Sequence, residues 1–152
     1  MNLSDNERID YKMNMYKVMK EKHTKEMNDF PMMFAFSDDQ FIKGMDVLGV
    51  TDESDLLSIG YGGFIRKADR NALDELMEKH DREMKDAISN DTTGDGFIYD
   101  MFNYELANHE YSYTCDVSDT LNALGFTIDY VNSNKNVLNG LLKAVEYQES
   151  QD

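Results

Sequence analysis

The sequence predicts an α+β fold that is mostly helical, with a single compact domain of roughly five to six helices and a small β-hairpin or sheet near residues 56–66. Three observations predict it. Apolar residues recur at helical spacing over most of the chain. Two short β-like runs flank a glycine-rich turn. The length of 152 residues, with one proline, suits one ordinary core without a low-complexity linker.

The first segment, residues 1–30, is predicted to be an amphipathic, methionine-rich helix. Ser4 and Glu7 have the spacing of a capping box, and the helical pattern continues until Phe30-Pro31 ends it. Seven of the 11 methionines lie within or next to this segment. Because methionine faces adapt to partners, we expect a docking or dimerisation element, with plain core packing as the equal alternative. Residues 31–152 are then the acidic α+β domain.

The next segment combines a short apolar run with a capped helix. Residues 32–36 are apolar, which indicates a buried strand or a core connector. Ser37 and Gln40 form a second capping box, and the helix that follows is expected to stop at Gly49.

A hairpin and further helices are predicted beyond Gly49. The runs 56–59 and 64–66 flank Gly60-Tyr61-Gly62-Gly63, which is typical of a small hairpin with a glycine-rich turn. Residues 111–114 alternate weakly and are a candidate extension of the sheet. The remaining helices are expected at 69–89, 97–109, 117–124 and 135–148, with a short helical turn at 128–132.

Charge is the strongest functional signal in the chain. The sequence carries 30 acids and 15 bases, a net charge of −15. The 49 residues between Lys85 and Lys135 contain no base and nine carboxylates. Such a one-signed field attracts a basic partner and argues against direct binding to nucleic acid, which needs clusters of lysine and arginine. A charge that serves solubility alone is the other reading.

We expect this acidic stretch to form the partner-binding surface, with tyrosines as anchors beside the carboxylates. Packing of the same aromatic residues in the core is the alternative. The candidate carboxylates are Asp86, Asp91, Asp95, Asp100, Glu105, Glu110, Asp116 and Asp119, and the candidate anchors are Tyr99, Tyr104 and Tyr111.

Two groups of residues suggest metal binding, and neither is complete. Residues 91–102 resemble an EF-hand loop, with Asp91 and Asp95 at ligand positions, but Phe102 stands where a bidentate glutamate is needed. The alternative is that Asp95 caps the helix that begins at Phe97. Glu105 and His109 are one turn apart, and the other histidines, His23 and His80, lie in different predicted helices and are not expected to converge. We therefore expect no metal and no cofactor, with a weak calcium-responsive module as an alternative.

No arrangement of residues indicates catalysis. Gly60-Tyr61-Gly62-Gly63 lacks the lysine and helix of a phosphate-binding loop. Cys115, the single cysteine, has no motif neighbours and permits no intramolecular disulfide. We expect a protein that is not an enzyme, located in the cytoplasm, with neither a signal peptide nor a membrane-spanning segment.

Three stretches, FPMMFAFSDDQFIKGMDVLGV, SIGYGGFIRKAD and GFIYDMFNYELANHEYSYT, resemble small acidic proteins carried by phages and mobile elements of low-GC Gram-positive bacteria. That group is largely of unknown function and supplies no catalytic residues. The resemblance implies an anti-defence role of the anti-CRISPR type, in which the protein occupies the basic groove of a host CRISPR effector nuclease. A homodimeric, non-enzymatic phage accessory protein is the alternative.

Overall fold

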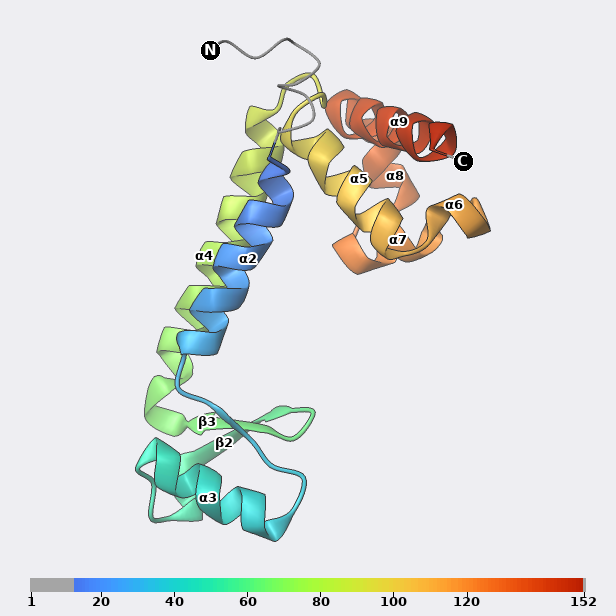
Figure 1. The fold of residues 1–152 in the computed structure, drawn as a ribbon. Coiled ribbons are helices and arrows are strands. Elements are labelled where there is room, and N and C mark those ends of the chain that lie inside the picture. Colours follow the sequence, from blue (N-terminus) through green and yellow to red (C-terminus); the bar gives the residue numbers. More distant parts are fainter. Residues whose placement is uncertain (1–12, 152) are drawn as a thin grey trace, which may run out of the picture. The chain divides into compact units, whose positions relative to one another are not determined.

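The computed structural model describes residues 13–151, and within them the mostly helical α+β class predicted from the sequence is confirmed (Figure 1). The expected capping box at Ser4 and Glu7 lies outside the described residues. No helix within residues 13–151 is both long and apolar enough to cross a membrane.

Contacts group the described residues into two compact units. Residues 13–22 and 84–151 belong to the first unit, and residues 23–83 belong to the second. The boundary falls inside two helices, α2 (Met15–Asp29) and α4 (Arg70–Asn90), and it does not coincide with the division at residue 30 expected from the sequence.

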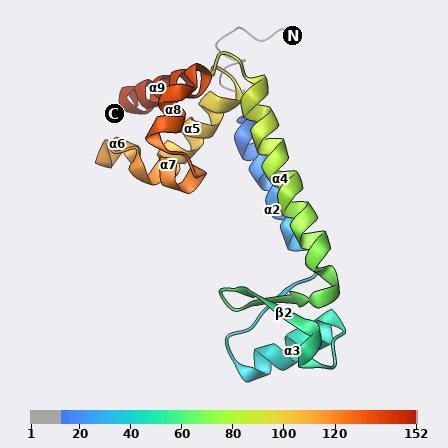
Figure 2. The ribbon, with the colours of Figure 1, turned by 180° about the vertical axis from the view of Figure 1, so that it is seen from behind.

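The first unit is built around one buried helix, α5 (Phe97–Asn108). Its Ile98, Met101, Phe102 and Leu106 are fully buried and share one face of the helix, and the side chains of Asp100 and Glu105 are buried as well. Helix α9 (Lys135–Ser150) packs along it (Figures 1 and 2). The other helices of this unit are α6 (Tyr111–Thr114), α7 (Ser118–Leu124) and α8 (Ile128–Ser133).

Two glycines permit a close approach between α9 and the loop that precedes α5. A Cβ atom on Gly94 would lie 2.1 Å from the carbonyl oxygen of Asn136, and one on Gly140 would lie 2.5 Å from Cγ2 of Ile98. The Asn136 side chain also donates a hydrogen bond of 3.0 Å to the carbonyl oxygen of Asp91. Backbone therefore packs directly against backbone at this point.

The second unit contains a three-stranded antiparallel sheet with the order β1-β3-β2. Its strands are β1 (Met33–Phe34), β2 (Leu56–Gly60) and β3 (Gly63–Arg66). Met33, paired with Phe64, packs with Leu56 and with Leu48 of α3 (Asp38–Leu48) to form a small core. Short 3-10 turns at Glu53–Asp55 and Lys67–Asp69 precede β2 and follow β3. The predicted hairpin is confirmed. Of the two alternatives for residues 32–36, a buried strand or a core connector, the structure shows a strand, limited to Met33–Phe34.

Local signals also fix the ends of α3. The Ser37 hydroxyl accepts a hydrogen bond of 3.2 Å from the backbone N–H of Gln40, as the capping box predicts. Gly49 follows the helix with a φ of 69°, a left-handed conformation that glycine adopts without steric cost.

Two histidines from different helices meet in the second unit. Helices α2 and α4 lie side by side and run in opposite directions (Figures 1 and 2), and the rings of His23 and His80 stack with their centroids 3.9 Å apart. Each histidine precedes a glutamate by three residues, and Nε2 of each lies 3.7–3.8 Å from a carboxylate oxygen of the other helix, on Glu83 and Glu26. The expectation that these histidines do not converge on one another is wrong, because it ignored the pairing of the helices.

The stacked histidines do not form a metal site in this arrangement. The planes of the two rings are 15° apart and the centroids 3.9 Å apart, so the nitrogen lone pairs lie in two separate, nearly parallel planes and do not meet at one ion. No group of three or more ligating side chains suited to a metal ion occurs among residues 13–151.

The expected extension of the sheet at residues 111–114 is wrong, because this segment is the short helix α6. Its backbone hydrogen bonds are local: the N–H of Thr114 donates to the carbonyl oxygen of Glu110, and that of Cys115 donates to Tyr111. The alternation of apolar and polar residues over these four positions is too weak to predict a strand, and the chain instead forms local helical hydrogen bonds after the end of α5.

Candidate functional site

The acidic stretch between Lys85 and Lys135 does not form one continuous surface. Asp100 and Glu105 are only 4% and 2% exposed. Both were expected to face a partner, and the structure corrects this by placing them in the interior of the first unit. Burying a carboxylate is costly unless hydrogen bonds or opposite charges compensate, and both carboxylates have such partners.

Glu105 is the centre of a buried polar network. Its Oε1 accepts hydrogen bonds of 2.8 Å from the Tyr16 hydroxyl and from the Lys20 ammonium group, and its Oε2 lies 3.3 Å from Nε2 of His109. Burial raises the pKa of Glu105, but the hydrogen bonds from Lys20 and Tyr16 and the charges of Lys20 and His109 outweigh it, so the pKa is lowered. Burial and the bond to Glu105 raise the pKa of Tyr16 above its usual value, which keeps the tyrosine a donor.

The lowered pKa of Glu105 predicts acid sensitivity. A carboxylate with a lower pKa in the folded state stabilises the fold above its unfolded pKa of about 4.3, and this stability is lost as pH falls through the folded pKa. Glu105→Gln removes the titrating group. Between about pH 5 and 3, its melting temperature is expected to fall less steeply with pH than that of the wild type, as measured by circular dichroism. Parallel curves would contradict this assignment.

Asp100 caps the beginning of α2. Its Oδ2 accepts a hydrogen bond of 3.0 Å from the backbone N–H of Met15, and its carbonyl oxygen accepts one of 2.9 Å from the Asn14 side chain. A carboxylate at the start of a helix satisfies a backbone donor and complements the helix dipole. The role of Asp100 is therefore structural.

Asp91 organises the loop that resembles an EF-hand. Its two carboxylate oxygens accept hydrogen bonds from the backbone N–H groups of Gly94, Gly96 and Ile98, at 3.0, 3.1 and 2.9 Å. Asp91, and not Asp95 as the sequence suggested, caps α5. These three hydrogen bonds hold the loop against the start of α5, and the calcium-responsive alternative stays a prediction.

Bases from distant parts of the chain reach into this acidic stretch. Asp95 forms an ion pair with Lys143 of α9 and accepts a hydrogen bond from the Asn139 side chain. Lys20 of α2 reaches Glu105 in the same way. The acidic stretch contains no base of its own, but in the folded protein lysines from other segments pair with its carboxylates.

The three candidate tyrosine anchors are at least partly buried. Tyr111 is 5% exposed, and its hydroxyl donates a hydrogen bond of 2.8 Å to Glu149; burial and this carboxylate raise the pKa of Tyr111 to about 12. Tyr104 packs on the ring of Tyr16, with centroids 5.5 Å apart. Tyr99 is half-buried against Tyr147. Tyr111 is thus a core residue, and Tyr99 and Tyr104 present only part of their rings.

The exposed acids that remain carry no ion pair within residues 13–151. Three of them lie close together along the chain, Glu110, Asp116 and Asp119, and we call residues 110–119 the acidic segment. Tyr113, near its centre, is 88% exposed, although it was not among the expected anchors. Its position in the short helix α6, with Tyr111 turned inward, is what exposes it. The other exposed acids of the stretch are Asp86 and Asp129.

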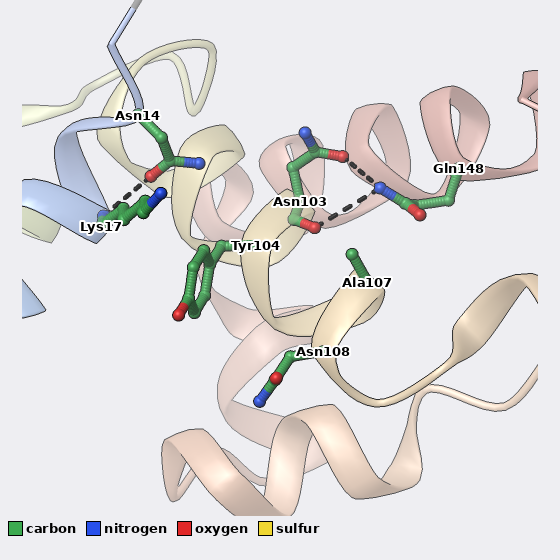
Figure 3. Close-up of a pocket in the computed structure, with 7 residues that line it drawn as sticks. All are labelled: Asn14, Lys17, Asn103, Tyr104, Ala107, Asn108 and Gln148. Atoms are coloured by element: carbon green, nitrogen blue, oxygen red, sulfur yellow. Dashed lines mark hydrogen bonds between the residues drawn. The ribbon is translucent and has the colours of Figure 1, made fainter.

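The first unit also has an open hollow of about 510 Å³ (Figure 3). Its polar groups are mainly amides bonded to neighbours: the Gln148 side chain donates to both oxygens of Asn103, and Oδ1 of Asn14 accepts from the N–H of Lys17. Among residues 13–151, no carboxylate, histidine or cysteine lines it. The lining residues are Asn14, Lys17, Asn103, Tyr104, Ala107, Asn108 and Gln148.

Comparison with known proteins points to a family and to no function. A family model described as a family of unknown function (DUF7659) matches residues 15–147. No curated protein and no solved structure matches the chain.

Proposed function

The chain belongs to DUF7659, a family of unknown function, and we propose that it is a non-enzymatic acidic protein that binds a basic, nucleic-acid-binding surface of another protein. The observation that carries the proposal is the acidic segment, in which Glu110, Asp116 and Asp119 are exposed around an exposed tyrosine. Within residues 13–151 none of these three carboxylates has an ion pair to neutralise it.

The chemistry of this segment suits binding better than catalysis. Carboxylates of one sign raise the rate of encounter with a basic surface and fix the orientation of the complex. Tyrosine adds a large contact area and one hydrogen-bonding group at little cost in side-chain entropy. Tyr113, flanked by Glu110 and Asp116, combines both kinds of contact.

In its most specific form, the proposal names a CRISPR effector nuclease as the partner and competition with nucleic acid as the mechanism. The resemblance to phage-borne acidic proteins and the exposed carboxylates support this form. It predicts that the protein lowers DNA cleavage by purified RNA-guided nucleases of low-GC Gram-positive bacteria at stoichiometric amounts, without turnover.

A homodimer is the second candidate, because Met13 and Met15 remain 64% and 52% exposed near the start of α2. Light scattering distinguishes the two candidates. A stable dimeric mass without any bound partner would favour the accessory protein, and a monomer that captures a basic protein would favour the inhibitor.

Reversing the charge of the acidic segment tests the proposed function. The triple variant Glu110→Lys, Asp116→Lys, Asp119→Lys is expected to bind the captured partner at least about 30-fold more weakly, close to 2 kcal/mol, because three attractive charges become repulsive. Binding is measured by affinity capture from nuclease-treated lysate, followed by titration of the purified partner at low and high salt. The fold should survive, because all three side chains are exposed. Asp116→Lys also removes the hydrogen bond of 2.8 Å from the N–H of Ser118 at the start of α7, and the loss of this cap is expected to lower stability only modestly.

A matched control separates a defined site from net charge. Asp74, Glu75 and Glu78 are exposed on α4, and changing them to lysine alters the net charge by the same amount. This control is expected to weaken binding much less. Equal losses in the two triple variants would show that only overall acidity matters, and unchanged binding in the first would reject the acidic segment as the site.

A further inference from the structure

We propose that the second unit carries a docking surface of its own, at the turn between β2 and β3, for a basic protein segment that presents apolar side chains. The surface, here called the turn patch, consists of Phe34, Phe36, Ile59 and Tyr61. This inference goes beyond the proposed function, because it rests on residues 23–83 alone and involves none of the acidic segment.

The turn patch is one contiguous surface. A Cβ atom on Gly62 would lie 2.5 Å from the ring of Phe36, so this ring covers the glycine. A Cβ on Gly63 would lie 2.9 Å from Ile59 and 3.0 Å from the ring of Phe34. Three apolar side chains from β1, the segment after it, and β2 therefore converge on two glycines.

These side chains stay exposed although they pack together. Phe34 is 55% exposed, Phe36 77% and Ile59 38%. They lie on the sheet face opposite α3: Phe34 pairs with Gly63, whereas its neighbour Met33 pairs with Phe64 and is buried against α3. Exposed apolar side chains are ordinary when single, but a contiguous group rimmed by polar residues marks an interaction site.

Tyr61 gives independent support for an interaction role. It is 97% exposed, and its φ of 53° is left-handed, as is that of Gly62 at 77°. Two successive positive φ values in a two-residue hairpin turn are the pattern of a type I′ turn, where asparagine, aspartate and glycine are favoured and a bulky residue is strained. The backbone of Tyr61 is strained, and its side chain packs on little of its own protein. Contact of this side chain with a partner would explain why a tyrosine occupies the position.

The charge around the turn patch defines its occupant. Between Ser37 and Ile65 the chain carries one base, Lys43, and six acids, all of them exposed. Within residues 13–151 none of these six acids forms an ion pair. Asp38 and Asp39 directly follow the patch residue Phe36 and Ser37, whereas the other four lie further along α3 or before β2 and add to the negative field of the second unit. An apolar centre beside unneutralised carboxylates fits apolar side chains flanked by lysine or arginine. The six acids are Asp38, Asp39, Asp46, Asp52, Glu53 and Asp55.

The test uses the full-length protein and Tyr61→Asn. Asparagine suits a type I′ turn better than tyrosine, so this variant should melt at the same temperature as the wild type or higher while it lacks the aromatic anchor. The probe is a fluorescein-labelled peptide with leucine and tryptophan at its centre and lysines at both ends. Two comparison peptides carry serine at the centre or glutamate at the ends.

We expect the amphipathic basic peptide to bind the wild type and to shift the NMR amide signals of residues 34–39 and 59–63. Tyr61→Asn should weaken this binding at least tenfold, and both comparison peptides should bind at least tenfold more weakly than the probe. Tyr113→Asn, which removes another highly exposed tyrosine, from the first unit, is the control and should bind the probe as the wild type does.

Several outcomes overturn the inference. Equal affinity of Tyr61→Asn and the wild type would remove the turn patch as the site, as would signal shifts confined to other residues or no binding of the probe. Self-association that Tyr61→Asn abolishes would make a second copy of this chain the occupant. The charge reversal of Glu110, Asp116 and Asp119 leaves the turn patch intact. The test of the turn patch and the test of the proposed function can therefore fail independently of each other.

Discussion

Glu105→Lys is expected to abolish the folding of the first unit. The substitution places a second ammonium group beside Lys20 at a position that is 2% exposed, and it removes the acceptor of the Tyr16 hydroxyl. An uncompensated buried charge costs about 3–5 kcal/mol, and repulsion from Lys20 adds to this. A loss of at least about 4 kcal/mol is comparable to the whole stability of a small domain. Urea unfolding followed by circular dichroism measures it.

Glu110→Lys is the matched control for this prediction. The residue is five positions further along, belongs to the same base-free run and undergoes the same charge change, but its side chain is exposed. Its free energy of unfolding should change by no more than about 0.5 kcal/mol. Similar stabilities for the two variants would contradict the burial of Glu105 and the network built on it.

Gly94→Ala is expected to produce the second large loss. The added Cβ atom would lie 2.1 Å from the carbonyl oxygen of Asn136 and 2.9 Å from the backbone nitrogen of Gly140, so α9 would have to move away. The φ of 85° is also unfavourable for alanine. Overpacking and backbone strain together predict a loss of about 3–5 kcal/mol in the free energy of unfolding.

Gly125→Ala separates the two causes. Gly125 also has a left-handed φ, 74°, but a Cβ atom there would meet nothing within 4 Å. Only the strain of about 1–2 kcal/mol should remain. If Gly94→Ala cost no more than Gly125→Ala, the close approach between α9 and the loop before α5 would be refuted.

The parts of the fold that could be predicted from the sequence are those set by neighbours along the chain. The Ser37 cap, the Gly49 stop and the hairpin over 56–66 depend on interactions within a few residues, and each is confirmed. The helix at 111–114 shows the limit of this reasoning, because four residues of weak alternation carry too little periodic signal to decide between helix and strand.

The candidate site was predicted less well, because exposure depends on contacts between distant segments. Glu105 and Asp100 are held by residues of α2, more than 80 positions away, and Asp95 is paired with Lys143 of α9. A count of charges along the chain cannot show these partners. The second unit was therefore not considered as a binding site, although residues 23–83 carry 14 acids and seven bases.

Three signals for the missed residues were present in the sequence. The spacing His-x-x-Glu occurs both at His23 and at His80, which is the pattern expected where two paired helices present equivalent faces. Phe34 and Phe36 lie two residues apart, on one face of an extended segment. Tyrosine is unfavourable in a glycine-rich turn such as the one that contains Tyr61. Residues that break a local conformational preference are often found at functional sites.

Competition with nucleic acid tests the central claim most directly. Fluorescein-labelled DNA is bound to the partner captured by this protein, and the protein is titrated into the complex while fluorescence anisotropy is recorded. The account predicts that DNA is released at stoichiometric protein, and that release weakens as salt rises. A stable ternary complex, with the DNA still bound when the protein saturates its partner, would contradict the account.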